Sequence, residues 1–169
     1  MQTWSSNFVS LIGNLSPIHL FCIFFQQAEG NEMDAAFAEI GSGFAEKIIA
    51  RDYDAAREFL APWLREITTA KDLKSMVERA LGDLPDPARF ELDGNSCGLE
   101  DLEVDEHSPP TKPLSNQITD DNYRKWMCIT FQPDPEENTG YDACFDLWMA
   151  LVNVSGSLKI GYLEPTDPD

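Results

Sequence analysis

The chain has 169 residues, of which 43% are hydrophobic and 11% aromatic, values typical of a globular domain that argue against a disordered chain. Its 30 acidic and 12 basic side chains give a formal net charge of −18, and residues 91–169 hold 17 of the acids and 4 of the bases. Such a surface repels phosphate, so no nucleic-acid partner is expected. The acidity either keeps the protein soluble or attracts a basic partner.

Residues 1–32 differ in composition from everything that follows. Residues 8–25 carry no charge, but polar and helix-breaking residues such as Pro17 and His19 lower their apolar density below that of an ordinary membrane span. No lysine or arginine precedes Lys47, so the positively charged start of a signal peptide is missing. We expect a non-native or poorly ordered extension; a signal or anchor and an integral part of the fold are the alternatives.

The helical pattern begins at Met33, which favours a chain that starts there. The expected organisation is an extension over residues 1–32, a single domain over 33–165 and a tail over 166–169. The location expected for this domain is cytoplasmic, or exported if residues 1–28 act as a signal. No membrane contact is expected from Met33 onward.

Three amphipathic helices are predicted between residues 33 and 82. In the first, apolar residues from Phe37 to Ile48 recur at the i, i+3, i+4, i+7 spacing of one buried helix face. Gly41 and Gly43 lie within this pattern, and each weakens the helix by ~1 kcal/mol relative to alanine. Glycine in a helix often marks the close approach of another element, which we expect here.

The other two helices are predicted from their end signals. Asp52 is a good N-cap for the second helix, and Pro62 breaks or kinks it near its end. Thr69 and Asp72 have the spacing of a capping box at the start of the third helix, and Gly82 ends it.

The pattern then changes to the period of two that is typical of strands. Strands are expected around residues 90–92 and 102–104, at 123–131, at 143–154 and, after a tight Ser155-Gly156 turn, at 158–163. In the 123–131 run, Tyr123, Met127 and Phe131 alternate with Trp126 and Cys128. Helices followed by a strand meander predict an α+β domain with N-terminal helices packed on one face of an antiparallel sheet.

The four cysteines are expected to be reduced thiols. Cys22, Cys97, Cys128 and Cys144 form no C-x-x-C pair, and their spacing fits no zinc pattern. A bridge between Cys128 and Cys144 is the alternative, if their strands are neighbours in an oxidising compartment.

The segment ARDYDAAREFLAP, residues 50–62, carries a family resemblance. It resembles the short second helix of the nuclear-transport-factor-2-like superfamily, the cystatin-like α+β cone. The resemblance implies that residues 33–163 make up the whole domain, with a strongly curved sheet and a conical pocket between helices and sheet. Some members of that group are isomerases, dehydratases or cyclases of small apolar substrates, and many others are binding, dimerisation or accessory modules.

The resemblance also implies candidate site residues. Asp146, inside an apolar strand, is the candidate catalytic base, because an apolar pocket raises a carboxyl pKa toward neutrality; the alternative is a solvated position on the outer face. Tyr53 or Tyr162 would then donate a hydrogen bond to the substrate. The candidate pocket-lining residues are Phe44, Tyr53, Trp63, Met127, Trp148 and Tyr162, for most of which the alternative is an ordinary core position.

No metal site and no cofactor are expected. His107 lies in an acidic loop without a recurring ligand spacing. Asp134 begins an echo of a calcium loop, but Thr139 replaces the required glycine and Phe145 the required glutamate. Phosphate-binding and dinucleotide-binding motifs are absent.

These observations favour a binding module over an enzyme, because no histidine joins Asp146 in an acid–base pair. The expected partners are a small apolar ligand or a protein, and a second copy paired through the open sheet face that bears Tyr123, Trp126 and Tyr162. One alternative is a small-molecule isomerase, dehydratase or cyclase that uses Asp146. The other is an acidic accessory protein that docks on a basic partner.

Overall fold

The computed structural model describes residues 35–95, 99, 114–134 and 144–166, and the chain divides into two units, Met1–Ala35 and Ala36–Asp169. The elements described below belong to the second unit, apart from Ala35, the first residue of the first helix. Several sequence-based expectations lie outside the described residues, namely those for residues 1–32, the strand at 102–104, the tail beyond Thr166, His107, Cys22 and Cys97.

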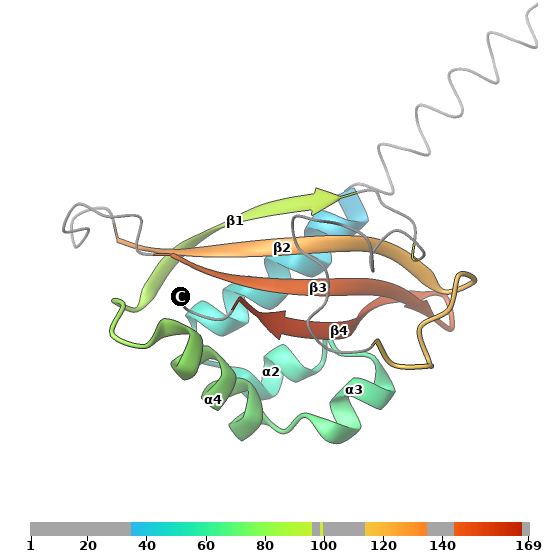
Figure 1. Cartoon of the computed structure of the whole chain (residues 1–169), viewed down its shortest axis with the longest axis horizontal. Coiled ribbons are helices and arrows are strands. Elements are labelled where there is room, and N and C mark those ends of the chain that lie inside the picture. The colour runs from blue at the N-terminus through green and yellow to red at the C-terminus, as the bar shows by residue number, and fades with distance from the viewer. Residues whose placement is uncertain (1–34, 96–98, 100–113, 135–143, 167–169) are drawn as a thin grey trace, which may run out of the picture. The chain divides into compact units, whose positions relative to one another are not determined.

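Four helices precede the sheet in the described residues, one more than the sequence pattern predicts (Figure 1). The first spans residues 35–49, and it is followed by α2 (Tyr53–Arg57), α3 (Pro62–Ile67) and α4 (Ala70–Leu81). In Figure 1 the first helix passes behind the strands, whereas α2, α3 and α4 lie toward the β4 side of the sheet.

Pro62 begins a helix of its own, and the helix before it ends at Arg57. Of the two alternatives for Pro62, the break is therefore found, and the kink within one longer helix is wrong. The chain leaves α2 after Arg57, and the backbone of Leu60 forms a parallel bridge with Ile160 of the last strand. The Ala61 amide donates to the Ile160 carbonyl at 2.7 Å. Proline then fits the first position of α3, because the amide it lacks would have no partner inside the helix. Pairing with the sheet therefore interrupts the helix.

The caps predicted from the sequence are confirmed. The Asp52 side chain accepts from the Ala55 amide at 3.1 Å at the start of α2. At the start of α4 the Thr69 amide donates to the Asp72 carboxylate at 2.8 Å, and the Asp72 amide donates to the Thr69 hydroxyl at 3.2 Å. Gly82 ends α4 with a φ of 52°, a conformation that glycine adopts without strain.

The sheet has four antiparallel strands in the order β1-β2-β3-β4. They are β1 (Pro87–Asn95), β2 (Tyr123–Pro133), β3 (Phe145–Val154) and β4 (Ser157–Pro165), coloured from lime to red in Figure 1. The tight turn between β3 and β4 is at Ser155 and Gly156, as expected. Helices packed against an antiparallel sheet confirm the predicted α+β class.

The main core lies between the helices and one face of the sheet. It joins the apolar stripes of the helices to alternate residues of the strands, including Phe44, Ile48, Leu73, Val77, Met127, Ile129, Phe131, Leu147, Met149, Leu151 and Ile160. Gly41 brings the first helix close to the sheet: a β-carbon there would lie 2.9 Å from Met127 Sδ. The close approach expected from that glycine is therefore confirmed.

A second cluster covers the opposite, outer face of the sheet. It contains Ala61, Ile118, Tyr123, Trp126, Ala150, Val152 and Tyr162, with Trp63, Leu99, Leu114, Trp148 and Val154 packed around them. Tyr123 belongs to this cluster although simple alternation places it with Met127 in the main core. A register irregularity between Tyr123 and Lys125 where β2 pairs with β3 changes the face that Tyr123 presents.

Candidate functional site

A cavity of about 220 Å³ lies at the end of the helical layer where the first helix stops. The end of that helix, the start of α2, one face of α4 and the segment entering β1 line it: Ile48, Ile49, Arg51, Tyr53, Lys74, Val77, Glu78, Leu81, Asp86 and Pro87. These elements meet at the left of Figure 1. No residue of β2, β3 or β4 lines it, so it is not a pocket between helices and sheet of the kind that the resemblance implies.

The apolar lining of the cavity comes from helix residues at core-facing positions. Ile48 and Val77 are almost fully buried, and Ile49 and Leu81 pack against the same core. Ile48 and Val77 belong to the periodic stripes that anchor their helices, so the apolar surface is rigidly supported. These four residues and Pro87, beside a few polar ones, match the usual composition of a small-molecule site.

The charged residues that line the cavity are paired with one another. The Arg51 guanidinium forms an ion pair with Asp86, and Lys74 Nζ lies 3.6 Å from Glu78 Oε1 one helical turn away. All four side chains are more than half exposed, and exposed pairs of this kind contribute ~0–1 kcal/mol each. Two positive and two negative groups leave this lining electrically balanced.

Arg51 has an unusual backbone for a residue that is not glycine. Its φ of 57° is left-handed, and the Arg51 and Asp52 amides donate to the carbonyls of Ile48 and Lys47 at 3.0 and 2.9 Å. This is the Schellman motif that ends many helices, in which glycine is preferred at the position that Arg51 occupies. A residue other than glycine in the left-handed conformation costs ~1–2 kcal/mol, and such strain is found most often at functional sites. The Arg51 side chain reaches Asp86 beside the cavity.

Tyr53 is the polar residue of the cavity that has no charge. Burial raises the pKa of its phenol, with Glu78 and Asp86 adding to the rise and Arg51 opposing it. A phenol of ordinary pKa, about 10, is already protonated at neutral pH, so the Tyr53 hydroxyl can donate a hydrogen bond. Its hydroxyl makes no hydrogen bond within the part of the chain that the structure describes. Tyr53 is also the one candidate pocket residue from the sequence that lines this cavity.

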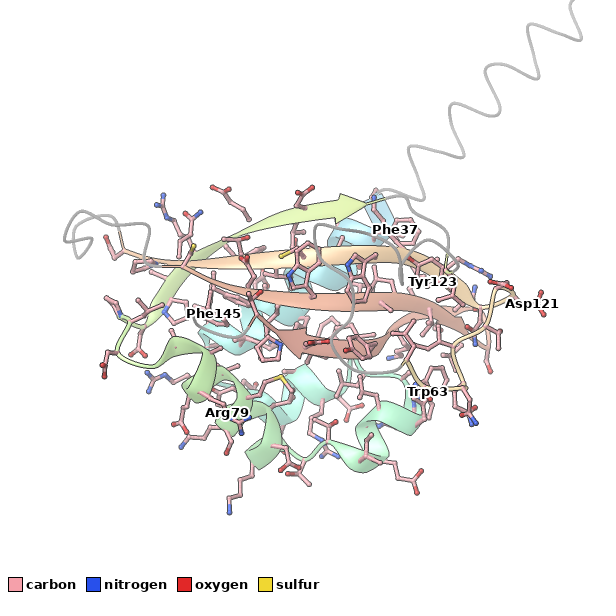
Figure 2. The ribbon with its side chains drawn as sticks, viewed as in Figure 1. Phe37, Trp63, Arg79, Asp121, Tyr123 and Phe145 are labelled. Carbon is pink, nitrogen blue, oxygen red and sulfur yellow. The ribbon has the colours of Figure 1, made fainter. Side chains whose placement is uncertain are left out.

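The other candidate pocket residues divide between the two faces of the sheet. Phe44 and Met127 are buried in the main core. Trp63, Trp148 and Tyr162 belong to the outer cluster, where the Trp63 indole donates to the Gly161 carbonyl at 3.1 Å. In Figure 2 Trp63 lies near α3, at the opposite end of the sheet from Phe145. These six residues therefore do not line one common pocket.

Asp146 lies on the outer face of β3, half-buried and opposite Thr130 of β2. Its neighbours in sequence, Phe145 and Leu147, point into the main core. Its Oδ1 atom is buried and has no hydrogen-bond partner among the described residues. Tyr53 lies in the helical layer, and the Tyr162 hydroxyl donates to Glu164. Neither tyrosine predicted to assist Asp146 is seen to pair with it.

The outer face of the sheet is aromatic, as the sequence predicts, but its aromatic residues are buried. Tyr123 and Tyr162 are 8% exposed and Trp126 only 1%, and Ile118 and Leu114 pack in the same cluster. Trp126 stacks on Trp148 with ring centres 5.9 Å apart. The large hydrophobic side chains that are exposed in the described residues are Ile67 and Leu84, and neither is on this face. The aromatic contacts proposed for a second copy are thus made within one chain.

Cys128 and Cys144 are both thiols, as expected from the sequence. Burial raises the pKa of Cys128 to about 12, and the Asp146 carboxylate adds to the rise. Cys128 is therefore a protonated, apolar-like residue at neutral pH. Cys144 is exposed.

Sequence reasoning missed the charged residues of the cavity. Lys74 and Glu78 lie in α4, whereas Arg51 follows the first helix and Asp86 precedes β1, and all four look like ordinary surface charges along the chain. One signal was available: an arginine stands directly after a helix where glycine is usual, and such a position predicts a strained backbone.

No protein-family model, no curated protein and no solved structure matches the chain. Among the described residues, no helix is long and apolar enough to cross a membrane, and no three histidine, cysteine or acidic side chains gather as metal ligands.

Proposed function

We propose that this protein is a binding module, built as a nuclear-transport-factor-2-like domain, that takes a small molecule into the cavity between the first helix and α4. The observation that carries the proposal is the cavity itself. It has a rigid apolar lining from Ile48 and Val77, and it combines a hydrogen-bonding group, Tyr53, with paired charges. A concave apolar site with a few convergent polar groups is the usual form of a ligand site.

Binding without catalysis is favoured by how the reactive groups are distributed. Asp146 lies on the outer face of the sheet, and Tyr53 lies in the helical layer. A general base must come within about 3 Å of the proton that it removes, directly or through one water. With Asp146 and Tyr53 on different layers, the isomerase alternative lacks its acid–base pair at the cavity.

The test is to fill the cavity and measure binding of single-ring molecules. In Leu81→Trp the larger side chain occupies the space that Leu81 borders; in the control, Leu84→Trp, the same change is made at an exposed position outside the cavity. The probes are ethylbenzene, acetophenone, benzoate and benzylammonium. Binding of each probe is measured by NMR from the changes that it causes in the backbone amide chemical shifts of the full chain.

We expect at least one probe to shift the amides of the cavity residues in the unchanged protein and in Leu84→Trp. The same probe should lose at least tenfold in affinity in Leu81→Trp. If no probe binds, or if binding survives in a folded Leu81→Trp variant, the proposed site is wrong.

A further inference from the structure

We infer that the ligand of this cavity is an uncharged, apolar molecule of about one ring that carries a hydrogen-bond acceptor for Tyr53. This inference rests on the proposed function and narrows it to a chemical class. Three features of the cavity carry it: its size, the pairing of its charges and the unused hydroxyl of Tyr53.

The size of the cavity limits the ligand. A dry protein cavity of about 150 Å³ holds benzene. The space here, about 220 Å³, therefore suits one ring with a short substituent rather than a sterol or a long acyl chain. Ile48, Ile49, Val77, Leu81 and Pro87 present apolar surface to such a ring.

The charges of the cavity favour a neutral ligand. Arg51 is paired with Asp86 and Lys74 with Glu78, so an anion has to compete with a carboxylate and a cation has to compete with a basic side chain. The net charge of −18 repels anions further. A neutral molecule leaves both ion pairs intact.

Tyr53 indicates which polar group the ligand carries. Its hydroxyl has no hydrogen-bond partner in the described residues, and, like any phenol with a pKa of about 10 or above, it is protonated at neutral pH. A ligand with a carbonyl or ether oxygen can accept that hydrogen bond. A purely apolar ligand leaves the hydroxyl without a partner in a partly buried site, which weakens binding.

The four probes of the cavity-filling experiment all carry one ring and differ in the charge and the hydrogen-bonding group of the substituent. Acetophenone has a ring and a neutral acceptor, ethylbenzene has the ring alone, benzoate is an anion and benzylammonium a cation. In the unchanged protein we expect acetophenone to bind about 3- to 10-fold more tightly than ethylbenzene, the range of one net hydrogen bond. Benzoate and benzylammonium should bind at least as weakly as ethylbenzene.

The matched variant is Tyr53→Phe, which removes the hydroxyl and keeps the ring. It should bring acetophenone to the affinity of ethylbenzene and leave ethylbenzene unchanged. The ratio of the acetophenone affinity to the ethylbenzene affinity in the unchanged protein tests the inference even if Tyr53→Phe does not fold. A charged probe that binds most tightly, or an acetophenone affinity equal to that of ethylbenzene, overturns the ligand class while leaving the cavity as a site. Absence of binding by all four overturns the proposed function as well.

Discussion

Arg51 forms an ion pair with Asp86 beside the cavity while its own backbone is held in the left-handed conformation, with a φ of 57°. The pair links the end of the first helix to the segment that enters β1. Both side chains are about two-thirds exposed, so the pair alone contributes little to stability. The left-handed strain at Arg51 is therefore not offset by the stability that its ion pair contributes.

Replacing Arg51 with glycine should therefore stabilise the protein. Arg51→Gly relieves about 1–2 kcal/mol of left-handed strain and loses an exposed ion pair of about 0–1 kcal/mol. We expect the free energy of unfolding in urea to rise by about 1 kcal/mol. The control Asp86→Ala removes the same pair without changing the backbone at residue 51, and it should lower stability by less than about 1 kcal/mol. A glycine variant that is less stable than Asp86→Ala contradicts this explanation.

Gly41→Ala should destabilise the protein although alanine favours the helix. The gain in helix propensity is about 1 kcal/mol, but the new methyl group meets Met127 Sδ at 2.9 Å and Leu92 Cδ2 at 3.2 Å inside the packed core. Overpacking of this kind costs about 1–3 kcal/mol, so we expect a net loss of up to about 2 kcal/mol in thermal or urea unfolding. Ser42→Ala in the same helix is the control and should not lose stability. An increase with Gly41→Ala would show that Met127 can move aside.

Thr69→Ala should cost about 1 kcal/mol at pH 7 because it removes the cap of α4. The side-chain and backbone hydrogen bonds from Thr69 hold the pKa of Asp72 below its ordinary value. A lowered folded-state pKa stabilises the protein above the ordinary carboxyl pKa, and this stabilisation is lost as the pH falls through the folded value. The difference between the variant and the unchanged protein should thus shrink below about pH 4. Ser75→Ala, at an exposed position of the same helix, should show no such dependence.

The two described cysteines should differ sharply in reactivity. Cys144 is exposed, whereas burial raises the pKa of Cys128 to about 12. At pH 8 we expect iodoacetamide to modify Cys144 at least tenfold faster than Cys128, measured peptide by peptide by mass spectrometry. In urea the two rates should converge, which controls for intrinsic peptide effects. Rapid modification of Cys128 in the folded protein would mean that its strand opens.

Asp146→Asn tests whether the half-buried carboxylate of Asp146 stabilises the fold. Its Oδ1 has no partner in the described residues, and its charge helps to raise the pKa of Cys128. The neutral amide should leave the free energy of unfolding unchanged or raise it by up to about 1 kcal/mol. It should also speed modification of Cys128 at high pH, because one cause of the raised pKa is removed. A loss of more than about 2 kcal/mol would indicate that the carboxylate holds a structural partner.

Much of the helical layer could be predicted from the sequence because its signals are local. Asp52, the Thr69–Asp72 capping box and Gly82 depend on backbone groups within three or four residues, and the structure has each of them. The failures involve contacts between distant segments. Pro62 starts α3 because the chain before it pairs with Ile160, about a hundred residues later, and no helix signal carries that information.

The candidate site was harder to predict for the same reason. Alternation along β3 correctly places Leu147 and Trp148 on opposite faces of the sheet, but it does not predict which face borders a pocket. The irregularity beside Lys125 moves Tyr123 to the outer cluster, because a change in pairing with β3 reverses the face of every residue beyond it. Tyr123, Trp126 and Tyr162 were expected on an open surface. They are buried in a cluster with Leu114 and Ile118, which come from a segment without strand or helix signals.

By itself the sequence determined the α+β class, the ends of α4, the β3–β4 turn and the acidity of the sheet half, because periodicity, capping and charge are properties of neighbouring residues. Only the tertiary structure decided which side chains surround one space. The cavity joins Arg51, Tyr53, Glu78 and Asp86 from four separate segments, and their proximity comes from how the first helix and α4 pack on the shared core. Packing between separate elements is not encoded in any local pattern, so the residues that surround the cavity could be identified only from the tertiary structure.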